Sequence, residues 1–225
     1  MKKLRKMLFI VITVAIIFGC QIKAMAVLTP EWLSYILLDL NDRENLSDDT
    51  IALYNYIGKW SSSPTIASTN FNSNSYHMTS VQQAVDQWNG VTGMTSTVTL
   101  TSYITTNDDI HVYGGTLSQL TSFGIVGTTD FGVVNGYTKH NSSPVVSQFT
   151  YGGYTKYVID MDYASVFIIY KSQGLTRYRN TTLHEMGHAY GWFGHSTNSN
   201  DVMWFYDNDK VSLTDRDKKH LLLVY

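Results

Sequence analysis

The sequence predicts a single α+β domain, and three observations support this prediction. The first is an amphipathic helix from Ser80, whose apolar residues recur at helical spacing: Val81, Ala84, Val85 and Trp88. The second is a set of short apolar or alternating runs, typical of strands, at residues 95–102, 109–113 and 157–161. The third is length, since residues 27–225 are enough for one domain with a sizeable core.

Residues 1–26 are typical of a secretory signal peptide. Basic residues near the start precede an apolar run from Met7 to Gly19, and Ala24-Met25-Ala26 offers a small-x-small cleavage site. The apolar run is shorter than the roughly 20 residues that span a bilayer. We expect a secreted, extracellular protein, cleaved after Ala26 and without a transmembrane anchor. Cys20 leaves a second interpretation open, that of a lipid-modified cysteine and a lipid-anchored protein.

Cleavage after Ala26 would leave a mature chain without disulfides, because the single cysteine lies in the signal peptide. It would also remove five of the 16 Lys and Arg residues and none of the 18 Asp and Glu residues, which leaves a net charge of −7 with histidines neutral. This negative balance argues against nucleic acid as a partner. The sequence leaves the oligomeric state open and favours a monomer.

Residues 27–56 are expected to form either a short pro-segment or an extra N-terminal element. Pro30 can open a helix, and a second apolar cluster begins at Ile51 after an acidic stretch. A first strand is expected around Trp60 and Pro64–Ser68, ahead of the helix from Ser80. Glycines between residues 124 and 153 mark a loop-rich middle region.

The run HEMGHAYGWFGH places three imidazoles and one carboxylate within reach of a single metal ion. On a helix, His184 and His188 share one face. Glu185 is turned from His184 by about 100°, so it can reach a metal-bound water as a general base. Gly191 can end the helix, after which the chain can bring His195 to the same ion. Three nitrogen ligands leave a fourth position open, which is typical of catalytic zinc.

Together with the residues that follow it, this run resembles the signature of the metzincin clan of zinc metalloproteases, most of all a matrixin-like, secreted, bacterial-type catalytic domain. The family pattern is HExxHxxGxxH followed by a Met-turn, and Asp201-Val202-Met203-Trp204 resembles that turn. The spacing departs from the pattern, because three residues rather than two separate Gly191 from His195. A one-residue bulge that restores His195 is the favoured interpretation, and a site with only two histidines is the alternative.

The resemblance implies a zincin-like fold for residues 57–225: a twisted mixed sheet, a backing helix, a zinc-binding helix, and a short C-terminal subdomain with the Met-turn and a final helix. It implies one catalytic zinc on His184, His188 and His195, with Glu185 as the catalytic base. The expected function is that of a secreted zinc endopeptidase acting on protein or peptide substrates. The alternative is a catalytically inactive secreted zinc-fold binding protein, such as an adhesin or an inhibitor.

A second ion, either calcium or another zinc, is a weaker expectation. The candidate ligands are His111, His140, Asp130 and Asp160. Their spacings do not match the structural-zinc segment of the family, so they stay outside the predicted site.

Two features lie beyond the Met-turn. Tyr206 is a candidate oxyanion donor, although it lies one position later than the metal-contacting tyrosine of related families. Thr214 and Asp217 predict a capped helix that runs to Leu223.

Overall fold

The computed structural model describes residues 56–102, 107–122, 135–140, 145–151, 153–172, 174–196, 198–206 and 208–225. The predicted signal peptide, almost all of the predicted pro-segment, and the candidate ligand Asp130 lie outside this part of the chain. Residue 56, the last of the predicted pro-segment, already belongs to the first strand.

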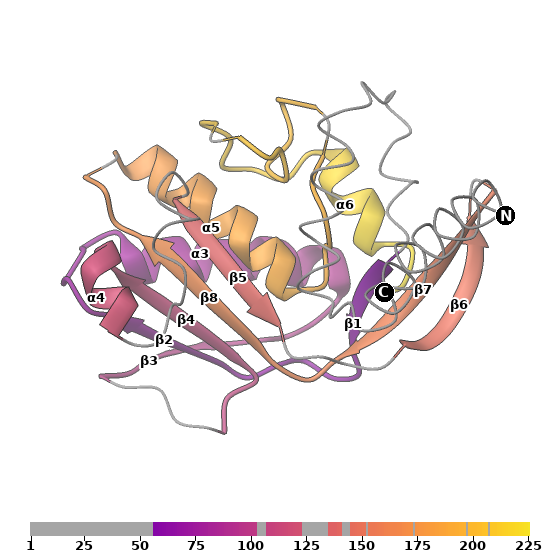
Figure 1. The fold of residues 1–225 in the computed structure, drawn as a ribbon, viewed down its shortest axis with the longest axis horizontal. Helices are drawn as coiled ribbons and strands as arrows, with labels where there is room; N and C mark the ends of the chain where they lie inside the picture. The colour runs from indigo at the N-terminus through magenta and orange to yellow at the C-terminus, as the bar shows by residue number, and fades with distance from the viewer. Residues whose placement is uncertain are drawn as a thin grey trace, which may run out of the picture.

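The described strands form two sheets (Figure 1). The smaller sheet has three strands, in the order β1 (Tyr56–Trp60), β7 (Tyr154–Met161) and β6 (Val145–Tyr151). The larger has five, in the order β3 (Val98–Leu100), β2 (Ile66–Asn70), β4 (Ile110–Gly115), β8 (Ala164–Ile169) and β5 (Gly136–His140). The helices are α3 (His77–Thr92), α4 (Leu117–Ser122), α5 (Leu175–Ala189) and α6 (Asp215–Leu221).

The prediction of one mixed sheet needs correction, because the chain passes from one sheet to the other between β7 and β8. β7 pairs with β1 in parallel and with β6 antiparallel, whereas β8 pairs with β4 in parallel and with β5 antiparallel. Only Asp162 and Tyr163 separate the two strands, and both lie outside the ladders. Both sheets are mixed, as predicted. The apolar pattern of a segment predicts that the segment is a strand, but it does not predict which sheet the strand joins.

The predicted amphipathic helix is confirmed as α3, which begins three residues earlier than the sequence suggested. All four residues of its apolar stripe are at most 1% exposed: Val81, Ala84, Val85 and Trp88. α3 and α5 lie side by side against the larger sheet (Figure 1). Trp88 joins the two helices, because its Nε1 donates a hydrogen bond to the Leu183 carbonyl at 2.8 Å. This packing fixes the helix that carries the HEMGH run.

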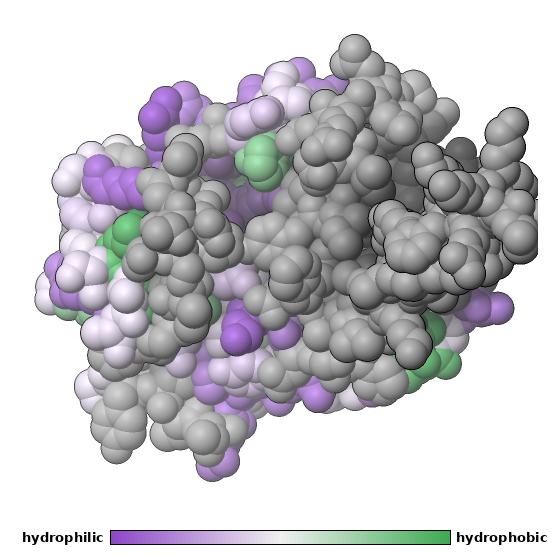
Figure 2. Space-filling model, in the orientation of Figure 1, coloured by the Kyte–Doolittle hydropathy of each residue, from purple (hydrophilic) through white to green (hydrophobic). Residues whose placement is uncertain are grey.

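The two faces of the larger sheet have different cores. Val166 and Ile168 of β8 belong to the main core with α3 and α5, whereas Phe167 and Ile169 pack against Leu120 of α4 on the other face. β8 is therefore buried on both faces, as its unbroken apolar sequence suggests. In the face shown in Figure 2, the described surface is mostly polar, with small apolar patches. Within the described residues, no helix has the length and apolar character required to traverse a bilayer.

His77 is a buried residue at the start of α3. Its ring is 0% exposed and lies between two hydroxyl groups, with Nε2 2.8 Å from Ser68 Oγ and Nδ1 2.8 Å from Tyr178 Oη. Burial lowers the pKa of His77 to about 4. The neutral ring therefore links β2, α3 and α5 through hydrogen bonds rather than through charge.

Candidate metal centre

His184 and His188 project from the last two turns of α5 toward a common point. Their Nε2 atoms lie 3.2 Å apart, as expected for ligands four residues apart on a helix. The Nδ1 of His184 lies 2.8 Å from the Val202 carbonyl oxygen, and the Nδ1 of His188 lies 2.7 Å from the Trp192 carbonyl oxygen. Both rings are thus held from behind by the backbone of the segment that follows the helix.

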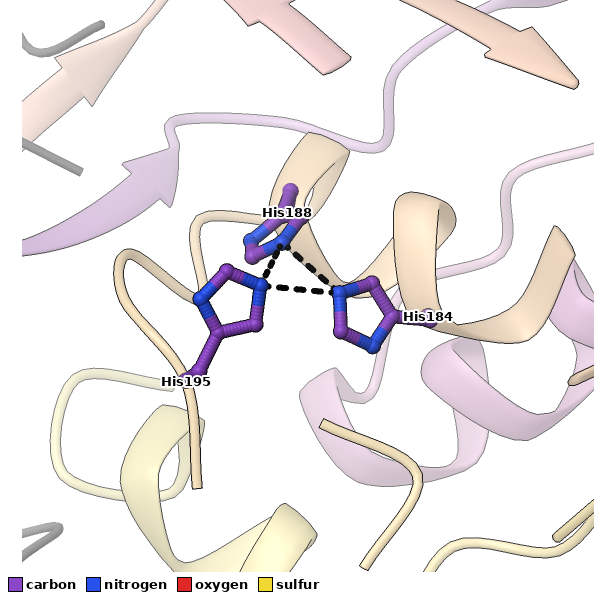
Figure 3. Close-up of side chains that lie close together, drawn as sticks. All are labelled: His184, His188 and His195. Carbon is purple, nitrogen blue, oxygen red and sulfur yellow. Dashed lines mark hydrogen bonds between the residues drawn. The ribbon is translucent and has the colours of Figure 1, made fainter. Parts of the chain in front are cut away.

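His195 joins the other two histidines despite the extra residue in the loop. Its Nε2 lies 3.0 Å from that of His184 and 3.3 Å from that of His188. Figure 3 shows the three rings pointing toward one another, two from the helix and one from the loop beyond it. Gly191 and Gly194 both have positive φ, of 104° and 87°, so the loop turns twice and absorbs the added residue.

The hydrogen bonds behind the rings decide which nitrogens face the centre. A carbonyl oxygen only accepts, so His184 and His188 must donate from Nδ1, and in their neutral forms Nε2 carries a lone pair without a hydrogen. Two such lone pairs 3.2 Å apart repel each other unless a cation lies between them. The arrangement therefore favours a positively charged ligand at the point where the rings meet.

A tetrahedral metal ion fits this cluster. Zn–N distances of about 2.0–2.1 Å place two ligand nitrogens of a tetrahedron about 3.3 Å apart, close to the 3.0, 3.2 and 3.3 Å found here. Burial lowers the pKa of His184 to about 4 and the pKa values of His188 and His195 well below the usual value, so all three rings are neutral near pH 7. Three histidines at these positions could hold a metal ion.

Glu185 lies beside this cluster without being part of it. Its side chain is 7% exposed, and its Oε2 lies 2.7 Å from the Thr138 hydroxyl on β5. Gly136 of the same strand passes so close that a Cβ there would lie 2.6 Å from Glu185 Cγ. Burial raises the pKa of Glu185 to about 8, and the bond with Thr138 acts in the opposite direction. A cation held by the histidines would favour the ionised carboxylate.

Met203 packs against the turn of α5 that carries His184 and His188. It is 0% exposed, and a Cβ on Gly187 would come within 2.6 Å of its sulfur. Gly187 therefore lets the methionine approach the helix between the two histidines. The residue of the predicted Met-turn thus packs against α5 at Gly187.

Asp217 of α6 fixes the turn that carries Met203. Its carboxylate accepts hydrogen bonds from the backbone N–H groups of Val202 and Met203, both at 3.0 Å. It also completes the capping box with Thr214, which confirms the predicted helix start. Because the Val202 carbonyl orients His184, Asp217 is connected to the cluster through a single peptide. The sequence identified Asp217 as a cap but gave no sign of this second contact.

The C-terminal end of α5 is completed by residues from other parts of the chain. A helix leaves its last carbonyls without partners in the helix itself. Three carbonyls in this region accept bonds from outside: Ala189 from Trp60 Nε1 at 2.9 Å, Tyr190 from the Tyr225 hydroxyl at 3.1 Å, and Gly191 from the Gly58 N–H at 2.8 Å. The start of the loop to His195 is therefore fixed by β1 and by Tyr225, neither of which the motif contains.

The weaker candidates within the described residues, His111, His140 and Asp160, form no ligand group with one another. His111 contacts the Tyr163 hydroxyl at 2.9 Å, whereas His140 is buried with its ring edge against Phe193. In the described part of the chain, the group of three or more potential ligands is His184, His188 and His195, and it includes neither of these histidines nor Asp160. Tyr206 is 57% exposed and packs on Phe205, whose ring contacts His195.

Fold and site together define a mixed α+β domain with a cluster of three histidines that could hold a metal ion. No family model and no curated protein matches the sequence. The chain is similar to a solved structure of myroilysin, with 13% sequence identity and a TM-score of 0.37 over 74% of this chain and 95% of that one. A second myroilysin structure gives 12% identity and a TM-score of 0.38 over 75% and 90%. The chemistry of the site therefore rests on its own residues.

Proposed function

We propose that this protein is a zinc-dependent endopeptidase of the metzincin type, with His184, His188 and His195 as the metal ligands and Glu185 as the general base. The observation that carries the proposal is the meeting of three neutral Nε2 atoms at 3.0–3.3 Å beside a buried carboxylate. The histidines supply three ligands, which leaves a fourth position for water or substrate. The match to the matrixin-type motif adds support from the sequence alone.

In this proposal the chain's own residues handle the proton. A zinc ion, when bound, would supply a Lewis acid that makes water nucleophilic and stabilises negative charge on oxygen. Glu185 accepts a proton from the water whose oxygen bonds to the peptide carbonyl carbon, and it returns that proton to the amine nitrogen as the C–N bond breaks. The three imidazoles stay neutral throughout, and backbone carbonyls hold His184 and His188 in their tautomers.

The proposal includes export of the protein and a role outside the cell. The sequence of residues 1–26 supports a signal peptide, and residues 57–225 would form the catalytic domain after its removal. Residues 27–56 are proposed as a pro-segment or an N-terminal extension. The substrate would be a protein or peptide in the extracellular medium.

Replacement of Glu185 by glutamine is the test. The amide keeps the size of the side chain but cannot accept the proton, so we expect peptide hydrolysis to fall by about 10²–10⁴-fold while one zinc per chain is retained. His195→Ala serves as the paired variant, and it should lose both zinc and activity. Peptide-library cleavage and metal analysis of the same samples measure both quantities.

The alternative function, an inactive zinc-fold binding protein, predicts a different outcome. Its zinc would have a structural role, so Glu185→Gln would keep its zinc and bind the partner as well as the wild type does, and there would be no peptide hydrolysis to lose. A zinc-loaded, mature wild-type protein that cleaves no member of a broad peptide library would rule out the endopeptidase.

A further inference from the structure

We propose that Thr138 is a positioning residue for Glu185, holding its carboxyl group in one orientation against α5. The inference rests on the proposed function and adds to it a residue outside the motif. Thr138 belongs to β5, at the edge of the described five-stranded sheet, and lies 47 residues before Glu185. Nothing in the local sequence around Thr138 suggests a connection with the HEMGH run.

The contact between the two residues has an unusual form. The Thr138 hydroxyl lies 2.7 Å from Glu185 Oε2 and also 2.9 Å from the backbone carbonyl oxygen of Glu185. One hydroxyl therefore touches both the reactive end of the side chain and the helix backbone from which that side chain starts. A side chain whose carboxyl group is bonded to this hydroxyl has less freedom to turn about its χ angles.

A hydroxyl suits the position of Thr138 because it can both donate and accept a hydrogen bond. Threonine has one O–H donor and two lone pairs, whereas a backbone carbonyl can only accept. When Glu185 is ionised, the hydroxyl donates to the carboxylate. When Glu185 carries the proton, the hydroxyl can accept from the carboxyl O–H and donate to the Glu185 carbonyl. The hydrogen bond between the two side chains is kept in both states, without movement of the strand.

The pairing of β5 with β8 sets the position of the Thr138 hydroxyl relative to α5. In the antiparallel ladder Thr138 pairs with Val166, which is 0% exposed and belongs to the main core. Two residues earlier on the same face of β5, Gly136 leaves no room for a Cβ, which would lie 2.6 Å from Glu185 Cγ and 2.8 Å from Oε1. Gly136 and Thr138 thus enclose Glu185 from one side, the first by close approach and the second by a hydrogen bond.

The test replaces Thr138 by valine, which has nearly the same shape but no hydroxyl, and by serine, which keeps the hydroxyl. For zinc-loaded Thr138→Val we expect kcat to fall about ten-fold or more, in the range found for residues that orient a catalytic group. The KM should change less than about two-fold and the zinc Kd should not change, because the proposal has the hydroxyl act on Glu185 and assigns it no role in binding substrate or metal. Thr138→Ser should recover most of the lost kcat.

Thr69→Val is the matched control. Thr69 is a buried strand residue of the same sheet, and its hydroxyl donates to the Thr101 carbonyl at 3.2 Å. This variant loses a comparable hydroxyl away from Glu185, so its melting temperature should fall while its kcat stays at the wild-type value. A parallel loss of kcat in Thr69→Val would mean that any weakened strand harms the reaction, and the proposal would be wrong.

A second measurement uses the metal-free protein and needs no activity. If Thr138 and Glu185 are coupled, the melting temperature of the double variant Thr138→Val, Glu185→Gln should fall by less than the sum of the two single losses. Additive losses, or an unchanged kcat in Thr138→Val when the wild type cleaves peptide, would overturn the proposal and leave the endopeptidase standing. A wild type that binds zinc but cleaves nothing would instead reject the endopeptidase, and with it the role of Thr138.

Discussion

Replacement of Gly191 by alanine should damage this protein more than the same change at Gly93, although both glycines follow the end of a helix with positive φ. Gly191 has φ of 104° and Gly93 has φ of 72°. An alanine at either position must accept a left-handed backbone, at a cost of about 1–2 kcal/mol. The two sites differ in their surroundings, since an added Cβ at Gly93 meets no heavy atom within 4 Å.

At Gly191 the added Cβ would lie 2.3 Å from the carbonyl oxygen of Gly58 and 2.5 Å from its carbonyl carbon. Both are backbone atoms of β1, so the overlap is relieved only if the strand moves away from the end of α5. That movement breaks the bond from the Gly58 N–H to the Gly191 carbonyl, now 2.8 Å long, and adds about 1 kcal/mol. With the conformational term, we expect a total loss of about 2–3 kcal/mol.

Urea denaturation and thermal melting of the metal-free variants provide the assay. At about 2–4 °C per kcal/mol, Gly191→Ala should lower the melting temperature by about 8 °C and Gly93→Ala by about 5 °C. Zinc titration adds a second distinction, because the loop to His195 starts at Gly191: Gly191→Ala should raise the zinc Kd and Gly93→Ala should not. Equal melting losses with equal zinc affinities would refute the reasoning from close approach.

Two further predictions concern groups behind the site. Asp217→Asn replaces a carboxylate with two acceptor oxygens by an amide with one, so one of the N–H groups of Val202 and Met203 loses its partner. We expect the free energy of unfolding to fall by about 2–3 kcal/mol, measured by denaturation. We also expect weaker zinc binding through His184, measured by titration. Unchanged zinc affinity in the folded variant would contradict this. His77 has its pKa lowered to about 4 by burial, so its contribution to stability is complete above pH 6.5 and is lost as the pH falls from about 6.5 to about 4, by about 3 kcal/mol in total. Urea denaturation of the metal-free protein across this range should show a steeper loss for the wild type than for His77→Gln, and equal slopes would contradict the assignment.

The sequence predicted those structural features that depend on residues close together in the chain. The helix around Trp88 and the capping box of Thr214 follow from spacings of three and four residues, and the structure has both. The irregular spacing before His195 allows two interpretations, a bulge that restores the third histidine or a site with only two. The positive φ of Gly194 provides that bulge, and the spacing alone does not predict it. The contact of Thr138 with Glu185 depends on which strands become neighbours, and no pattern within either segment encodes that choice.

The hydrogen bonds that complete the C-terminal end of α5 have a consequence for the order of folding and metal binding. They join residues 129 positions apart at Trp60 and Ala189, and 35 positions apart at Tyr225 and Tyr190. Closing such long loops is slow and has an entropic cost, whereas the single turn that carries His184 and His188 forms locally. We therefore expect a newly made chain to offer only a weak, two-histidine site at first, and to acquire tight metal binding as the last event of folding, after β1 and Tyr225 have docked.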